Sequence, residues 1–175
     1  MVVHKGKTIF VGDTSVHEYP TSEQMAEIAI STARVVRLFG FEPKVAFVSH
    51  STFGQPLTSR TKHIRKAVDI LKEQKVDFEF DGDMQPDVAL NSDYKELYPF
   101  SNIVGKANIL IMPGQHSAAI SYKMMKTLGD TKVIGPLLIG LGLPIEIAPL
   151  RSSTSELINL ASVAAYSADI IDYKK

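Results

Sequence analysis

Residues 108–123, NILIMPGQHSAAISYK, constrain the fold of this chain more than any other stretch. The apolar run 109–112 ends at Pro113 and Gly114, and a helical pattern begins near Ser117. This order predicts a buried strand, a short polar loop and a helix. In open α/β sheets, ligands lie outside the carboxyl ends of the strands, where loops and helix N-termini present free N–H groups. We therefore expect this loop to border any binding site.

The rest of the chain repeats the same alternation of short apolar runs and amphipathic stretches. Strands are expected at residues 7–12, 44–48, 78–80, 108–112, 133–140 and 145–148, and helices at 21–39, 62–74, 84–89, 117–128 and 154–171. Strands and helices that alternate at this spacing imply right-handed crossovers and a mostly parallel sheet. The expected fold class is therefore a three-layer α/β architecture, with helices on both faces of the sheet.

Local signals mark the beginning of two of these helices. Thr21 and Gln24 have the spacing of a capping box, in which a hydroxyl accepts from an N–H group and an amide reaches back to the cap. Ser153 and Glu156 repeat this spacing ahead of the last helix. Glu156 therefore has a structural explanation before any catalytic one.

Composition excludes several classes of function. The chain has 175 residues, 45% of them hydrophobic, which is typical of one globular domain. Its 19 basic and 19 acidic residues cancel, so no overall field attracts nucleic acid or an anionic membrane. The absence of cysteine excludes disulfides and thiolate chemistry, and the five histidines show no metal-binding spacing, so no metal site is expected. No apolar run approaches about 18 residues, so we expect a cytoplasmic protein without a membrane span.

A loop that suits an anion follows the expected strand 44–48. It places the hydroxyls of Ser49, Ser51 and Thr52 and the backbone of Gly54 before a basic helix start. The basic side chains there are Arg60, Lys62, His63, Arg65 and Lys66. This arrangement suits a phosphate-bearing ligand. The alternative is a polar surface loop followed by a solvated basic helix face, and composition alone leaves both interpretations open.

Seven short motifs, which occur in a fixed order, are more specific than this periodicity. They are Asp13-Thr14 before a Pro-Thr helix start, Phe41-Glu42-Pro43-Lys44-Val45-Ala46, Asp81-Gly82-x-Met84-Gln85-x-Asp87, Ala107-Asn108-Ile109-Leu110-Ile111, Ile120-x-Tyr122-Lys123, Ile134-Gly135-Pro136 and Ile158-Asn159-Leu160-Ala161. Over residues 7–168 the chain resembles the second half of the phosphate acetyl/butyryl transferases, the phosphotransacetylase family. The resemblance implies an isocitrate/isopropylmalate-dehydrogenase-like fold. Residues 1–148 would be its second domain, and residues 149–175 a C-terminal helix that in the family returns to a first domain absent here.

Two further motifs are more similar to one branch of this family. Ser51-Thr52-Phe53-Gly54 and Tyr98-Pro99-Phe100-Ser101 resemble the branch that is fused to the C-terminus of bacterial NADP-dependent malic enzymes. For that branch the resemblance implies a domain that binds acetyl-CoA or CoA as a regulator and holds a homo-oligomer together. NADP and a divalent metal would then belong to the malic-enzyme region, outside this chain.

The family reaction moves an acetyl group between the sulfur of CoA and phosphate. A carboxylate takes the thiol proton, and arginines neutralise the phosphate charge. The resemblance keeps Lys123 as the residue implied to contact CoA, whereas the family's asparagine is Ala119 here. The catalytic aspartate falls on Glu156 and the arginine on Leu150, so that Arg151 is one position late. Because a displacement of about 1 Å can cost roughly a hundredfold in rate, we expect weak or absent transferase activity.

These features are compatible with three functions. The first is a regulatory and assembly domain of an NADP-dependent malic enzyme, which converts malate to pyruvate, with a CoA-ester site built from Ser49, Ser51, Thr52, Gly54, Arg60, Gln115, Ser117 and Lys123. The second is an active phosphate acetyltransferase that interconverts acetyl-CoA plus phosphate and acetyl phosphate plus CoA, with Glu156 and Arg151 as catalytic residues. The third is a domain that only oligomerises.

Overall fold

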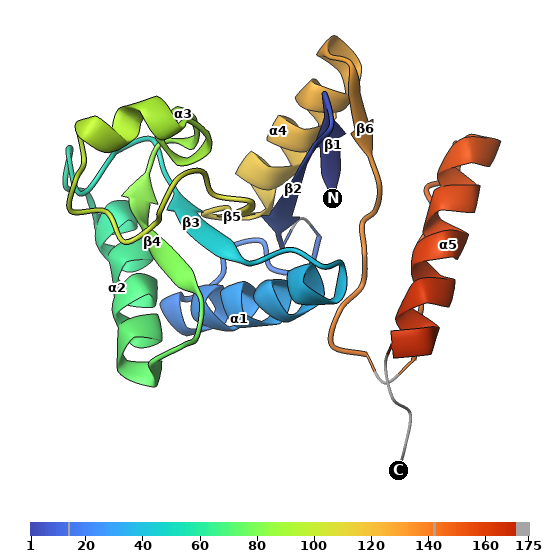
Figure 1. Cartoon of the computed structure of the whole chain (residues 1–175), viewed down its shortest axis with the longest axis horizontal. Helices are drawn as coiled ribbons and strands as arrows, with labels where there is room; N and C mark the ends of the chain where they lie inside the picture. The colour runs from blue at the N-terminus through green and yellow to red at the C-terminus, as the bar shows by residue number, and fades with distance from the viewer. Residues whose placement is uncertain (14, 142, 171–175) are drawn as a thin grey trace.

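Two neighbouring strands, β3 (Lys44–Val48) and β5 (Ile109–Ile111), are buried on both faces of the sheet. Their alternate side chains enter two separate hydrophobic clusters, one with Val45, Phe47, Ile109 and Ile111 and the other with Ala46, Val48 and Leu110. Continuous apolar strands of this kind are typical of parallel sheets covered on both sides. The computed structural model describes residues 1–13, 15–141 and 143–170, which form the three layers that the sequence predicts (Figure 1).

The described strands form one six-stranded sheet in the order β4-β3-β5-β2-β1-β6. β4 (Glu79–Met84), β3, β5 and β2 (Lys7–Gly12) run parallel, which confirms the mostly parallel sheet. β1 (Val2–His4) and β6 (Thr131–Val133) are antiparallel to their neighbours. β1 was not predicted; it pairs with β2 across a tight turn in which Lys5 and Gly6 have φ values of 46° and 75°.

The helices cover both faces of the sheet (Figure 1). α1 (Ser22–Leu38) and α2 (Ser59–Gln74) pack on one face, and α3 (Pro86–Leu90) and α4 (Gln115–Leu128) on the other, with a 3-10 helix, η1 (Ser92–Glu96), after α3. The predicted capping box of Thr21 and Gln24 begins α1. α2 begins three residues earlier than predicted because Thr58 caps it, and α4 begins two residues earlier, after Gly114.

β4 is longer than the predicted strand 78–80 and carries two buried aspartates. The Asp81 carboxylate accepts a hydrogen bond from the N–H of Asn102 at 2.7 Å, and the Asp83 carboxylate accepts one from the hydroxyl of Ser51. A buried carboxylate needs such partners, since its desolvation is otherwise unfavourable. The prediction that the strand ends before Asp81 was therefore wrong. The groups that allow the two aspartates to be buried, Asn102 and Ser51, are distant in the sequence.

The prediction of strands at 133–140 and 145–148 was also wrong, apart from Val133, which ends β6. After β6 the chain becomes irregular, and the two segments share one isolated bridge, between Leu137 and Glu146. Gly135 and Gly140 have φ values of 124° and 83°, which interrupt the extended conformation of a strand. Apolar character alone therefore did not make these residues part of the sheet.

α5 (Thr154–Ile170) stands beside the sheet rather than against one of its faces (Figure 1). Leu160 and Val163 are its buried apolar residues. Tyr166 stacks on Phe39, with ring centroids 5.8 Å apart, and donates a hydrogen bond to the carbonyl of Leu38 at 2.8 Å. The predicted helix end at residue 171, like the rest of 171–175, lies outside the described residues. The division of the chain into 1–148 and 149–175 stays a prediction.

Asn108 joins the amino ends of β5 and β3, and this link can be tested. Its amide oxygen accepts from the N–H of Lys44 at 2.8 Å, and its amide nitrogen donates to the carbonyl of Glu42 at 2.8 Å. We expect Asn108→Ala to lower the free energy of unfolding by about 1–3 kcal/mol, because two backbone groups lose their partner. Asn108→Asp keeps the acceptor and loses the donor, so its loss should be smaller. Urea denaturation followed by circular dichroism measures both, and equal stability of Asn108→Ala and the unsubstituted protein would contradict this role.

Candidate functional site

The loops that follow β2, β3 and β5 lie at the carboxyl edge of the sheet, as their parallel direction predicts. The N–H of Gln115 donates to the carbonyl of Glu18 at 3.2 Å, which joins loop 13–20 to the start of α4. The Nε2 of His63 donates to the carbonyl of Pro20 at 2.9 Å, which joins the same loop to α2. Loop 13–20 therefore contacts both other parts of the predicted site.

The predicted ligand groups of loop 49–60 are hydrogen-bonded within the protein. Ser51 is fully buried and donates to Asp83, and the N–H of Gly54 donates to the same carboxylate at 3.4 Å. The hydroxyl of Thr52 accepts from the backbone N–H that follows β4 at 3.2 Å, and that of Ser49 accepts from the N–H of Ser51 at 3.3 Å. These residues fix the loop to the end of β4.

Basic side chains at the start of α2 remain near the surface. Arg60 is exposed, and Lys66 forms an ion pair with Glu23 at 2.7 Å. Arg65 lies against Gly54, where an added Cβ would be 2.7 Å from its Nη1, so the glycine makes room for the guanidinium. This corner therefore keeps positive charge, but solvent and salt screen its attraction for an anion.

The predicted residues on α4 differ in their surroundings. The hydroxyl of Ser117 donates to the carbonyl of Gly114 at 2.8 Å, inside the first turn of the helix. Lys123 is exposed, and its Nζ lies 6.0 Å from the centroid of the Tyr122 ring. Lys123 can therefore reach a ligand at the surface, whereas the hydroxyl of Ser117 is engaged in the helix.

Glu156 is held at the start of α5 by two sets of hydrogen bonds. Lys126 donates to one carboxylate oxygen, and the N–H of Ser153 donates to the other at 2.8 Å, completing the predicted capping box. The hydrogen bond from Lys126, followed by those from Ser153, lowers the pKa of Glu156 to about 2. A carboxylate with so low a pKa is a weak base for a thiol proton. Arg151, the other predicted catalytic residue, is exposed in the turn before the helix.

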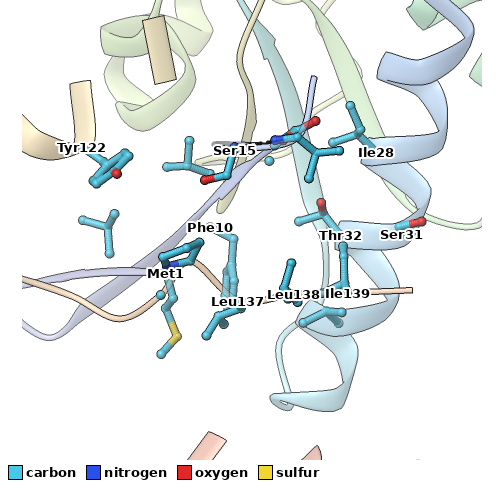
Figure 2. Close-up of a pocket in the computed structure, with 18 of the residues that line it drawn as sticks. Met1, Phe10, Ser15, Ile28, Ser31, Thr32, Tyr122, Leu137, Leu138 and Ile139 are labelled. Carbon is cyan, nitrogen blue, oxygen red and sulfur yellow. Dashed lines mark hydrogen bonds between the residues drawn. The ribbon is translucent and has the colours of Figure 1, made fainter. Parts of the chain in front are cut away.

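A cavity of about 300 Å³ lies between loop 13–17, α1 and segment 133–139 (Figure 2). Its polar side chains are Asp13, Ser15, His17, Glu27, Ser31, Thr32 and Tyr122. All ten predicted site residues belong to the described part of the chain, and none of them lines this cavity. Tyr122, the neighbour of Lys123, does line it, so the cavity and the predicted surface site meet at α4.

Asp13 is the most strongly hydrogen-bonded group of the cavity. Its carboxylate accepts from the N–H groups of Ser15, Val16 and His17 at 3.1, 2.8 and 2.9 Å, and also from the ring of His17. Burial alone would raise the pKa of Asp13, but the hydrogen bonds, led by that from Val16, bring it below its usual range. An aspartate directly after a strand, before small polar residues, is the sequence signal that could have indicated this turn.

Two features that the described residues lack bear on metal binding and on membrane insertion. No three His, Asp or Glu side chains among residues 1–13, 15–141 and 143–170 converge as a metal site would require. Within the same ranges, no helix combines the length and apolar character needed to cross a bilayer.

Comparison with known proteins shows the family to which this chain belongs. The family described as Phosphate acetyl/butaryl transferase matches residues 1–165. An NADP-dependent malic enzyme of Rhizobium meliloti is 49% identical over 164 residues, which are 94% of this chain and 22% of that protein. A phosphate acetyltransferase of Clostridium acetobutylicum is 34% identical over 91% of this chain and 49% of that protein. The solved structure of a EutD phosphotransacetylase from Staphylococcus aureus matches with a TM-score of 0.86 at 27% identity, over 95% of this chain and 52% of that one.

Two substitutions distinguish the capping box of Ser153 and Glu156 from the ion pair of Glu156 and Lys126 at the start of α5. Ser153→Ala removes the capping hydroxyl and is expected to destabilise the helix by about 0.5–2 kcal/mol. Glu156→Gln keeps a side chain able to cap but removes the ion pair with Lys126, so its effect should be smaller and should vanish at high salt. Hydrogen exchange of the α5 amides measures both effects.

The effect of Glu156→Gln should also depend on pH. Because the pKa of Glu156 is lowered from 4.5 to about 2, the ion pair contributes fully above pH 4.5 and its contribution is lost as the pH falls toward 2. Identical α5 exchange in Glu156→Gln and the unsubstituted protein at pH 7 and low salt would contradict the ion pair.

Proposed function

Since this chain belongs to the phosphate acetyl/butyryl transferase family, we propose that it is a regulatory and assembly domain of an NADP-dependent malic enzyme. The domain binds acetyl-CoA or a related CoA ester and has no transferase activity. Its parent protein oxidises malate to pyruvate in the cytoplasm, with NADP and a divalent metal held outside this chain. The 49% identity to a malic enzyme of Rhizobium meliloti supports this parent protein. The chain matches about a fifth of the length of that enzyme.

The observation that carries the proposal is that the carboxylate of Glu156 is already hydrogen-bonded within the protein. Acetyl transfer to or from CoA needs a base for the thiol proton, and a base is most effective when its pKa lies near the working pH. The pKa of Glu156 is about 2, and both carboxylate oxygens are hydrogen-bonded by Lys126 and Ser153. A carboxylate with these partners is suited to capping the helix and poorly suited to accepting a thiol proton.

Binding of a CoA ester does not require the same geometry as transfer. A long ligand is held by many contacts that are made equally in the ground state. The exposed Lys123 and the positive charge of Arg60 and Arg65 support recognition of phosphate groups. The cavity beside Tyr122 supports recognition of an apolar group.

An assembly role is supported by apolar side chains on the outer face of α4. Ile120, Met124 and Leu128 are spaced by four residues, so they share one side of the helix. Each is more than half exposed. An apolar stripe of this kind is typical of a surface that another protein surface covers, here that of a second copy.

An active phosphate acetyltransferase is the second candidate, supported by the likeness to the Clostridium acetobutylicum enzyme. The two functions are separated by an assay of the full-length protein. We expect no acetyl phosphate from acetyl-CoA and phosphate above the rate without protein, because Glu156 and Arg151 are not arranged as a base and a phosphate ligand. Turnover that is abolished by Glu156→Gln would favour the transferase and contradict the regulatory proposal.

Regulation is tested by the malate-dependent reduction of NADP in the full-length protein, with increasing acetyl-CoA. We expect the rate to change with acetyl-CoA, and Lys123→Ala to weaken the apparent affinity for it by about tenfold or more, as the loss of one hydrogen bond to a charged group does. Lys106→Ala is the matched control, since Lys106 is also exposed but precedes β5 at the opposite edge of the sheet. No binding of acetyl-CoA at millimolar concentration in calorimetry would refute the proposal.

A further inference from the structure

Asp13 and His17 form a carboxylate–imidazole pair in the wall of the cavity of Figure 2. Although burial raises the pKa of Asp13, its hydrogen bonds hold that pKa below the usual range, so the carboxylate is ionised at neutral pH. An ionised carboxylate only accepts hydrogen bonds, and the nitrogen that faces it, Nδ1 of His17, therefore carries a proton. In the neutral ring, Nε2 then has a free lone pair and can act as a base.

Asp13 also fixes the position of the imidazole ring. Its side chain is 9% exposed, and it accepts hydrogen bonds from the backbone N–H groups of Ser15, Val16 and His17. The side chain of His17 is 33% exposed, so water and a ligand both reach it. Among the described residues, none forms a hydrogen bond with Nε2 of this ring. A histidine that is oriented by a buried aspartate, with its second nitrogen free, is the arrangement of a general base in many hydrolases.

Thr32 is a second group of the cavity whose polar atom is not satisfied. It lines the cavity from α1 and is only 7% exposed, yet its hydroxyl has no hydrogen-bond partner in the described part of the chain. Burial of a hydroxyl without a partner is unfavourable, so this position favours an occupant that forms a hydrogen bond. A hydroxyl can donate to a carbonyl oxygen, and the bond strengthens as that oxygen gains negative charge.

The other charged groups that line the cavity have partners within the protein. The amino group of Met1 donates to the carbonyl of Ile134 at 2.9 Å, and the carboxylate of Glu27 accepts from the hydroxyl of Ser31 at 3.3 Å. Neither lysine nor arginine lines the cavity within the described ranges. The imidazole base and the unpartnered hydroxyl are therefore combined with water, which reaches them without a charged site of its own.

We propose that this cavity is a hydrolytic site for a small ester or thioester. His17 is the general base, Asp13 positions it, and Thr32 donates a hydrogen bond to the carbonyl oxygen of the substrate. A volume of about 300 Å³ is enough for a small acyl group and the atoms bonded to it. A CoA ester as the substrate rests on the proposed function, whereas the hydrolytic chemistry does not.

The reaction consumes water and transfers one proton through the ring. Nε2 of His17 takes a proton from water, the water oxygen bonds to the carbonyl carbon, and the electron pair of the C=O bond moves to the oxygen that Thr32 binds. The carbon–sulfur bond, or the carbon–oxygen bond of an ester, then breaks. The leaving atom receives the proton from His17, so the products are a carboxylic acid and a thiol or an alcohol.

The test is thiol release from acetyl-CoA and from the acetyl thioester of N-acetylcysteamine by the full-length protein. The second probe lacks the nucleotide, so it reports on the cavity without the phosphate contacts of CoA. We expect the protein to accelerate hydrolysis of this probe, and His17→Ala to lower kcat/KM by about a hundredfold, as the loss of a positioned general base does. His116→Ala is the matched control, because His116 is exposed on α4 and does not line the cavity. No acceleration, or equal rates for His17→Ala and the unsubstituted protein, would overturn the site.

Further variants separate the chemistry from a structural role. Thr32→Val replaces the hydroxyl by a methyl group and should lower kcat by about a hundredfold, as removal of a donor to a developing oxyanion does. Asp13→Asn should lower kcat by about tenfold or more with little change in KM, because the amide no longer fixes the ring tautomer. Added imidazole should restore part of the rate of His17→Ala, which it would not do for a misfolded variant. An unchanged kcat of Thr32→Val, or no restoration by imidazole, would contradict the mechanism.

The neutral probe also distinguishes this activity from the proposed function. If no CoA ester binds, the proposed function fails, but hydrolysis of the probe that His17→Ala removes and His116→Ala keeps would still support the hydrolytic site. If acetyl-CoA binds and changes malate oxidation while the probe is not hydrolysed, the proposed function stands and the hydrolytic site is overturned.

Discussion

Burial of β3 and β5 on both faces is the constraint on which the rest of the structure depends. Val45 pairs with Ile109 in one hydrophobic cluster and Ala46 with Leu110 in the other, so one register serves both clusters. A shift by one residue would exchange the clusters that their side chains enter, which fixes the register strongly. Because β2 and β4 extend the same parallel set, the loops with polar and charged residues are brought to one edge of the sheet.

The parts of the fold that the sequence predicted well are those determined by local signals. Strand 44–48 and the capping box at Thr21 depend on neighbouring residues, and both were found where predicted. Residues 134–140 are as apolar as a strand, but positive φ values at Gly135 and Gly140 and the lack of a continuous partner keep them out of the sheet. Ladder pairing is a tertiary property, which a pattern of apolar residues does not contain.

The site was less predictable because its groups are partnered across long sequence distances. The hydroxyl of Ser51 suits a phosphate in the sequence, but its partner is Asp83, 32 residues later. The cavity is built from β2, α1 and segment 133–139, which meet only in the folded chain. Glu156 was the exception: its capping box with Ser153 was visible in the sequence, and Lys126 adds an interaction that spacing could not indicate.

α4 carries Tyr122 toward the cavity and Ile120, Met124 and Leu128 toward the outside. Residues two apart on a helix point in nearly opposite directions, so these two surfaces are separated by little more than the diameter of the helix, about 10–12 Å. Because one helix carries both surfaces, a rigid displacement of α4 would move them together. Communication between a bound small molecule and a neighbouring subunit would therefore need no relay of side chains, only the rotation or translation of one helix.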